Sequence, residues 1–163
     1  MQKISTCLWF DGQAEEAAKF YTSIFPNSEI THTILYPEAG HEIHGQKPGS
    51  VMTVEFFLSG RQYLGLNGGS IFKFNEATSQ MVNCETQKDI DFYWEKLGAG
   101  GDPQAQQCGW LKDKFGLSWQ IVPTMMAELF SKYDKAGRER AMAAMMKMKK
   151  LDIAALEKAA KGK

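Results

Sequence analysis

The chain carries one supersecondary pattern twice, and this repeat constrains its fold more than any other feature. A helical pattern with a Phe20-Tyr21 pair occupies residues 14–25, and a second one, with Phe92-Tyr93 at the matching position, occupies residues 86–97. Each pattern follows a strand-like run, at residues 7–10 and 80–84, and each is followed by further strands. A repeat of this length predicts two copies of one unit that share a core. Paired units leave a cleft, where we expect the function to reside.

Hydrophobic periodicity and turn signals divide the chain into residues 1–75, 76–123 and 124–163. The first part predicts a helix at 13–25 and strands at 4–10, 29–36, 51–58 and 62–66. A Pro- and Gly-containing loop is expected at 37–50. The second part predicts a strand near 80–84, a helix ending at Leu97, and a hairpin of 108–112 with 117–122. The third part, rich in Met, Ala and Lys, predicts helices lying on the core or on a partner subunit, the last at 153–160 capped by Asp152.

Charge and composition exclude several classes of function. Lys and Arg together number 19, as do Asp and Glu, so no net charge draws the chain to nucleic acid or to an anionic membrane. No apolar run is long enough to span a bilayer, and the first residues lack a signal-peptide pattern, so we expect a cytoplasmic protein. Cys7, Cys84 and Cys108 lack CxxC spacing and are expected to be reduced thiols without a nucleophilic role.

Several motifs resemble those of the PhnB-like proteins. The opening FDGQAEEA with FY and IFPNS (residues 10–28) is similar to the start of that family. The likeness continues through LNGG (66–69), CETQ (84–87) and YWEKL (93–97), and extends to the tail at 144–153. It is strongest at QCGWLKD (107–113) and GLSWQIVP (116–123). This family, also called 3-demethylubiquinone-9 3-methyltransferase-like, is a branch of the vicinal oxygen chelate superfamily with glyoxalase I, extradiol dioxygenases and bleomycin-resistance proteins.

The resemblance implies an α+β fold of paired βαβββ modules, the glyoxalase/bleomycin resistance/dioxygenase fold, here with a helical C-terminal tail. It also implies a homodimer, which exposed sheet edges and the Met-rich tail favour independently. Methyl transfer is not expected. S-adenosylmethionine is usually held by a glycine-rich loop between a strand and a helix N-terminus. Gly68-Gly69 leads to no helical pattern, and the glycines at 98–101 follow a helix.

Enzymes of the superfamily hold a divalent metal between their strands with His and Glu side chains. The resemblance and strand parity carry those positions to Thr6, to Leu64 or Leu66 with Asn67 the nearest polar side chain, to Ser79 and to Gln120. Leu8 shares the face of Thr6, while Trp9 and Trp119 are expected in the core. Trp110 could wall the site or fill a dimer interface. We therefore expect the ligand-binding residues Thr6, Leu8, Asn67, Ser79, Trp110 and Gln120.

Thr, Leu, Ser and Gln supply no charge, so neither a metal nor another cofactor is expected at these positions. The alternative is that Thr6, Ser79 and Gln120 merely satisfy one another or bound water. His41 and His44 are expected in a solvated loop that could close as a lid, with His32 on the preceding strand. Lys112 and Asp113 are expected to face solvent.

Two functions remain open. The first is a metal-independent protein that binds a small neutral or anionic molecule in a cup between modules, with no nucleic-acid or membrane partner. The second is an enzyme of the superfamily that acts on a small oxygen-rich metabolite, for which Glu55, His41 and His44 are the ionisable candidates.

Overall fold

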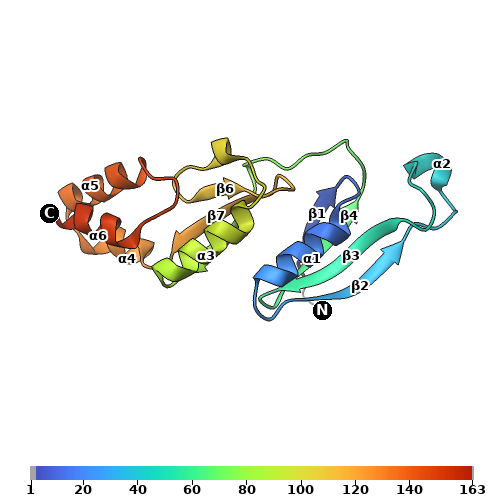
Figure 1. Cartoon of the computed structure of the whole chain (residues 1–163), viewed down its shortest axis with the longest axis horizontal. Coiled ribbons are helices and arrows are strands. Elements are labelled where there is room, and N and C mark those ends of the chain that lie inside the picture. The colour runs from blue at the N-terminus through green and yellow to red at the C-terminus, as the bar shows by residue number, and fades with distance from the viewer. Residues whose placement is uncertain (1–2, 163) are drawn as a thin grey trace. The chain divides into compact units, whose positions relative to one another are not determined.

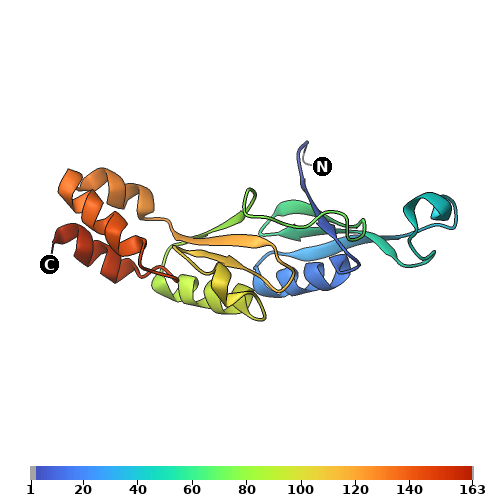
Figure 2. The ribbon, with the colours of Figure 1, turned by 90° about the horizontal axis from the view of Figure 1, so that it is seen from above.

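The chain forms two compact units, residues 1–74 and 75–163, in a computed structural model that describes residues 3–162 (Figure 1). Each unit packs one helix against one face of a small mixed sheet (Figure 2). The α+β class expected from the repeat is confirmed. We call the sheet surface that faces away from this helix the helix-free face of the unit.

The first unit contains a four-stranded sheet in the order β1-β4-β3-β2. Strand β1 runs parallel to β4, while the β4–β3 and β3–β2 pairs are antiparallel. Its elements are β1 (Thr6–Phe10), α1 (Ala14–Ile24), β2 (Glu29–Leu35), α2 (His41–His44), β3 (Val51–Leu58) and β4 (Arg61–Asn67). The sequence predicts a hairpin with its turn at Ser59-Gly60-Arg61, whereas in the structure Arg61 already belongs to β4 and the turn is Ser59-Gly60. Both turn residues have positive φ, as two-residue hairpin loops of the primed type require.

Helix α1 buries a stripe of small and aromatic side chains at helical spacing: Ala14, Ala17, Ala18, Tyr21 and Ile24. The Tyr21 ring packs against Phe56 of β3. The helix has no side-chain cap from its own N-cap residue, Gln13. Instead the Ala14 amide donates to Asn67 Oδ1 at 2.9 Å, so the end of β4 caps the helix.

The second unit repeats the pattern with one strand fewer. It contains β5 (Gln80–Cys84), α3 (Gln87–Gly98), a short 3-10 helix η1 (Pro103–Ala105), β6 (Trp110–Lys112) and β7 (Ser118–Pro123). Its described strands form a three-stranded sheet in the order β5-β7-β6. The segment after α3 contains glycines and a proline, which disfavour strand structure. A Cβ on Gly101 would lie 2.0 Å from the Lys112 carbonyl oxygen, so this segment approaches β6 through a residue without a side chain.

The C-terminal helices belong to the second unit. They are α4 (Met126–Lys132), α5 (Lys135–Met145) and α6 (Ile153–Lys161), and they enclose a cluster of their own: Leu129, Ala141, Leu151, Leu156 and Ala160. Partly buried methionines pack against this cluster. The tail is tied to the sheet by backbone hydrogen bonds of 2.8 Å from Cys108 N to Met148 O and from Gly109 N to Lys149 O. Asp152 caps α6 as predicted, because its side chain accepts from the Ala155 amide at 2.9 Å.

The segment 37–50 is not entirely a loop, as the sequence suggested. Residues His41–His44 form one helical turn, α2, with Gly40 and Gly45 at its ends in the left-handed conformation. Gly40 and Gly45, from which the sequence analysis predicted a loop, therefore flank one turn of helix. Among the described residues, no helix combines the length and apolarity that crossing a bilayer demands.

Asp113 is the clearest departure from the expected surface. Its side chain is 2% exposed. It accepts hydrogen bonds from Phe115 N at 2.8 Å, Leu117 N at 3.1 Å and the Trp119 indole at 2.8 Å. The carboxylate thus fixes the turn between β6 and β7 and holds Trp119 in the core. Position next to a lysine in a hairpin motif suggested solvent, but the buried donors of the turn need an acceptor.

Replacing Asp113 with Ala should lower the free energy of unfolding by about 3 kcal/mol or more, because each buried donor left unpaired costs about 1–3 kcal/mol. Urea unfolding followed by tryptophan fluorescence measures the change. Asp11→Ala, at an exposed turn position, is the control and should change stability little. A D113A unfolding midpoint equal to that of the wild type would contradict the structural role.

Candidate functional site

The helix-free face of the second unit brings together three of the predicted site residues. Buried residues of β7, Trp119 and Ile121, lie on the side of α3, and Gln120 points the other way, as strand parity predicted. Gln120 pairs with Trp110 across β6 and β7, and its Nε2 donates to Ser79 Oγ at 2.8 Å. Ser79 and Gln120 therefore satisfy each other in part, as one of the alternatives expected, while Trp110 stands beside them.

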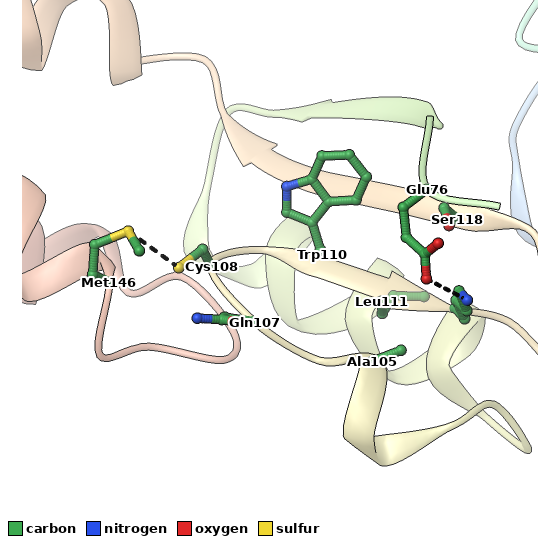
Figure 3. A pocket seen from close by; sticks show the side chains of 9 residues that line it. Glu76, Ala105, Gln107, Cys108, Trp110, Leu111, Ser118 and Met146 are labelled. Atoms are coloured by element: carbon green, nitrogen blue, oxygen red, sulfur yellow. Dashed lines mark hydrogen bonds and ion pairs between the residues drawn. The ribbon is translucent and has the colours of Figure 1, made fainter. Parts of the chain in front are cut away.

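A cavity of about 430 Å³ lies against β6 (Figure 3). Trp110, Lys112 and Ser118 line it from the sheet, Cys108 from the segment before β6, and Glu76 and Met146 from segments distant in sequence. Of the predicted site residues, only Trp110 lines this cavity; Gln120 and Ser79 lie next to it on the same face. Trp110 is half-buried, so its indole face is available as one wall.

Lys112, Ser118 and Glu76 are among the cavity residues that were not predicted as site residues. The Lys112 side chain is only 26% exposed and forms an ion pair with the Glu76 carboxylate (Figure 3). This ammonium group lowers the pKa of Glu76, mainly through its hydrogen bond. Lys112 pairs with Ser118 across the hairpin, so both side chains belong to one end of the cavity. Strand parity could have found both residues, because Lys112 lies two positions from Trp110 and Ser118 two from Gln120.

The opposite part of the cavity is rich in sulfur and carbon. The Cys108 thiol lies 3.8 Å from Met146 Sδ and 3.5 Å from the Met145 carbonyl oxygen. Figure 3 shows the two sulfur-bearing side chains pointing toward one another, away from the Glu76 end. Cys84, by contrast, is buried beneath the sheet, and burial together with Asp89 raises the pKa of its thiol to about 11. A raised pKa disfavours the thiolate, which is the nucleophilic form of cysteine.

In the first unit the expected strand parity was wrong. Leu8 is buried with Phe10 and pairs with Gly65, whose added Cβ would meet Ala14 of α1 at 3.1 Å. Thr6, Leu8 and Asn67 thus belong to the helix-covered face. Trp9 lies on the helix-free face instead, where its indole N–H donates to the Gly69 carbonyl at 2.7 Å. A tryptophan reads as core in a sequence, but its N–H needs an acceptor, and the glycine segment supplies one.

Asn67 has both ends of its amide occupied. Oδ1 accepts from Ala14 N, and Nδ2 donates to the Val51 carbonyl at 2.9 Å. Its side chain is 4% exposed, so it holds the helix and strands of the first unit together. We therefore leave Thr6, Leu8 and Asn67 out of the site proposed below.

The histidines have separate partners. His41 Nδ1 contacts the Gln46 carbonyl at 2.8 Å, and His44 accepts from the Gln46 amide while its ring packs on Tyr36. His32 Nδ1 lies 3.3 Å from Glu55, which also accepts from Gln62. This His32–Glu55–Gln62 cluster lies on the first sheet, with the His32 side chain 76% exposed and the Glu55 side chain 30% exposed. A histidine beside a carboxylate is a pair that general acid–base catalysis can use. The α2 histidines stabilise their own segment.

The family model for 3-demethylubiquinone-9 3-methyltransferase matches residues 2–122. The chain belongs to this PhnB-like family. The PhnB protein from Bacillus cereus is 38% identical, with a TM-score of 0.65, and the alignment covers 76% of this chain and all of that protein. Among curated proteins none matches.

Two more distant structures show the same fold. Protein PA1353 from Pseudomonas aeruginosa is 14% identical with a TM-score of 0.57, over 76% of this chain and 98% of that one. The fosfomycin resistance protein FosX from Listeria monocytogenes is 14% identical with a TM-score of 0.51, over 78% and 97%. At this identity the likeness concerns the fold alone. The C-terminal helices α4, α5 and α6 lie beyond residue 122, where the match to the family model ends.

A structure of FosX contains Mn(II). Whether the residues of this chain could hold such an ion depends on their own donor groups. On the helix-free face of the second sheet, Ser79, Gln120 and Trp110 carry neutral groups, and the Glu76 carboxylate that lines the cavity is paired with Lys112. Throughout residues 3–162, no three His, Cys, Asp or Glu side chains come together. A divalent cation needs charged or imidazole ligands to replace its hydration shell. These residues do not fit such a metal.

The glycines also fail to form a nucleotide-type cradle. Gly68-Gly69 follows β4 and leads into turns, and the glycines at 98–101 follow α3. Neither stands between a strand and a helix N-terminus, which is where the methyl donor is usually held. The geometry therefore gives no support to the activity in the family's name.

Proposed function

We propose that this PhnB-like protein binds a small organic molecule on the helix-free face of its second unit, without a metal ion. The observation that carries the proposal is the cavity beside Trp110, whose volume lies within the usual range of ligand sites, about 300–1,000 Å³. One aromatic wall, an ammonium group and a few hydroxyl and amide groups are the composition that such sites use. Gln120 and Ser79, which lie next to the cavity on the same face, add polar groups that a ligand could contact.

A thermal-shift screen of small neutral and anionic metabolites tests the proposal. Trp110→Ala should weaken every hit at least about tenfold, because truncating a central aromatic contact costs about 2 kcal/mol. Gln120→Ala should leave the unliganded melting temperature near that of the wild type and remove the protection by ligand. Gln104→Ala, on η1, is the matched control and should retain protection.

Hits that protect W110A and Q120A as well as the wild type would contradict the location of the site. Recovery of the bound compound unchanged distinguishes a binding protein from the alternative, an enzyme acting on a small oxygen-rich metabolite. That alternative draws on one observation, the His32–Glu55–Gln62 cluster of the first unit.

Ligand protection should also survive removal of metal. Protein purified without an affinity tag should contain no stoichiometric metal by elemental mass spectrometry, and dialysis against EDTA should leave the ligand-induced rise in melting temperature unchanged. The reason is the donor set: the cavity is lined by a single carboxylate, Glu76, which is paired with Lys112, and no three His, Cys, Asp or Glu side chains come together in residues 3–162. Stoichiometric metal, or protection lost on dialysis, would overturn metal independence.

We further propose that the protein is a homodimer. Strand β2 forms one edge of the first sheet and is exposed along most of its length, with Ile34 53% and Leu35 51% exposed. An apolar edge strand invites pairing with another chain.

Light scattering at micromolar concentration should give twice the mass of one chain, and Ile34→Glu should give a monomer. Ile43→Glu is the control, because Ile43 is also exposed but lies on α2, away from the edge. A monomeric wild type would contradict the dimer, and a dimeric I34E would contradict this interface.

A further inference from the structure

The Ser118 hydroxyl is buried without a partner. The residue is 1% exposed, and no hydrogen-bond partner for its Oγ exists among the described residues. A buried hydroxyl left unpaired is costly, so such groups are rare and call for an explanation. Ser118 lines the cavity, where a bound molecule would supply the missing partner.

A cation stands beside this hydroxyl. Lys112 and Ser118 are cross-strand partners in the β6–β7 hairpin, and both line the cavity. The Lys112 side chain is about three-quarters withdrawn from solvent, at 26% exposure. A hydroxyl donor and a partly desolvated ammonium group at one end of a cavity form a site for an anionic oxygen group, because charge-assisted hydrogen bonds strengthen where water is excluded.

In the structure, the ammonium group of Lys112 is paired with the carboxylate of Glu76. The Glu76 side chain is 63% exposed, and the residue lies in an irregular segment before β5. An ion pair with one partner this exposed contributes little to stability, since water screens it. An incoming anion could therefore displace Glu76 at small cost and take over both Lys112 and Ser118. The Glu76 carboxylate thus takes the position beside Lys112 that the anionic group of a ligand would take.

Apart from Gln107, the other residues that line the cavity are apolar or sulfur-bearing. Trp110 forms a flat wall, and Cys108 and Met146 close the other end with sulfur atoms 3.8 Å apart. Flat apolar groups pack well against an indole face and against methionine. One end of the cavity thus suits an anion and the other suits a flat hydrocarbon body.

We infer that the cavity takes a small organic acid, whose anionic oxygen group displaces Glu76 from Lys112 and hydrogen-bonds Ser118 while its flat body packs on Trp110. This inference rests on the proposed function and names its ligand class. The anion can be a carboxylate or a phosphate, which share this chemistry.

Three probes separate charge from shape. Phenylacetate carries a carboxylate, phenylacetamide is its neutral analogue of similar size, and phenyl phosphate offers the other anion. Titrations followed by the Trp110 indole NMR signal, assigned with Trp110→Phe, measure each affinity. The wild type should bind phenylacetate or phenyl phosphate at least about tenfold more tightly than phenylacetamide, as a charge-assisted hydrogen bond allows. Whichever of the two anions binds more tightly indicates whether the ligand carries a carboxylate or a phosphate.

Variants assign the charge effect to its residues. Lys112→Met should abolish the preference for the acid, whereas Lys88→Met, an exposed lysine on α3, removes the same charge and should retain it. Glu76→Gln should tighten binding of the acid severalfold and leave the amide unchanged, because it removes the competing carboxylate. Ser118→Ala should weaken acid binding without lowering the melting temperature, since its hydroxyl has no partner to lose.

Equal affinity for the acid and the amide, with both dependent on Trp110, would overturn this inference and leave the proposed function standing. A preference for the acid that survives in Lys112→Met, or an acid affinity reduced by Glu76→Gln, would also overturn it. A screen without any Trp110-dependent hit would overturn the proposed function, and the inference with it. Because Lys112→Met could disturb folding, its melting temperature is measured first, and Glu76→Gln provides the independent reading.

Discussion

The geometry of the cavity depends on the hydrogen bonds that the buried carboxylate of Asp113 accepts. It accepts hydrogen bonds from two turn amides and from the Trp119 indole, and so fixes the turn between β6 and β7. That turn sets the register in which Lys112 pairs with Ser118, and Trp110 with Gln120. A slip of one residue would move all four side chains to the other face. One carboxylate in the core therefore positions the polar groups in and beside the cavity.

The two units solve the same packing problem by different local means. Each buries one face of a sheet under one helix, but α3 begins with its own capping box, in which Thr86 and Asp89 satisfy each other's backbone amides. Helix α1 has no such box and takes its cap from Asn67, 53 residues away. Asn67, which the sequence analysis suggests as a ligand-binding residue, therefore caps a helix. The repeat is a repeat of topology, and the details diverge where the helices begin.

The same contrast separates polar groups that hold the fold from those that are free to bind. Asn67 and Asp113, with exposures of 4% and 2%, form side-chain hydrogen bonds to partners inside the protein. Ser118 is equally buried but unmatched, and Lys112 is matched only by an exposed carboxylate. Burial by itself does not distinguish structure from function. The presence or absence of a hydrogen-bond partner is more informative, because an unsatisfied buried group costs free energy that a bound molecule can recover.

The sequence by itself determined the two-unit pattern, the apolar face of α1, the Ser59-Gly60 hairpin, the capping of α6 by Asp152 and the family. These features follow from periodicity and from contacts a few residues apart, which a linear sequence records directly. It also placed Gln120 and Trp119 on opposite faces of one strand. Only the tertiary structure decided that Trp9 and not Leu8 lies on the helix-free face, that Asn67 caps a distant helix, and that Glu76 reaches Lys112. Each of these depends on an acceptor or donor contributed by a remote segment, and side-chain polarity alone does not say which remote group will meet it.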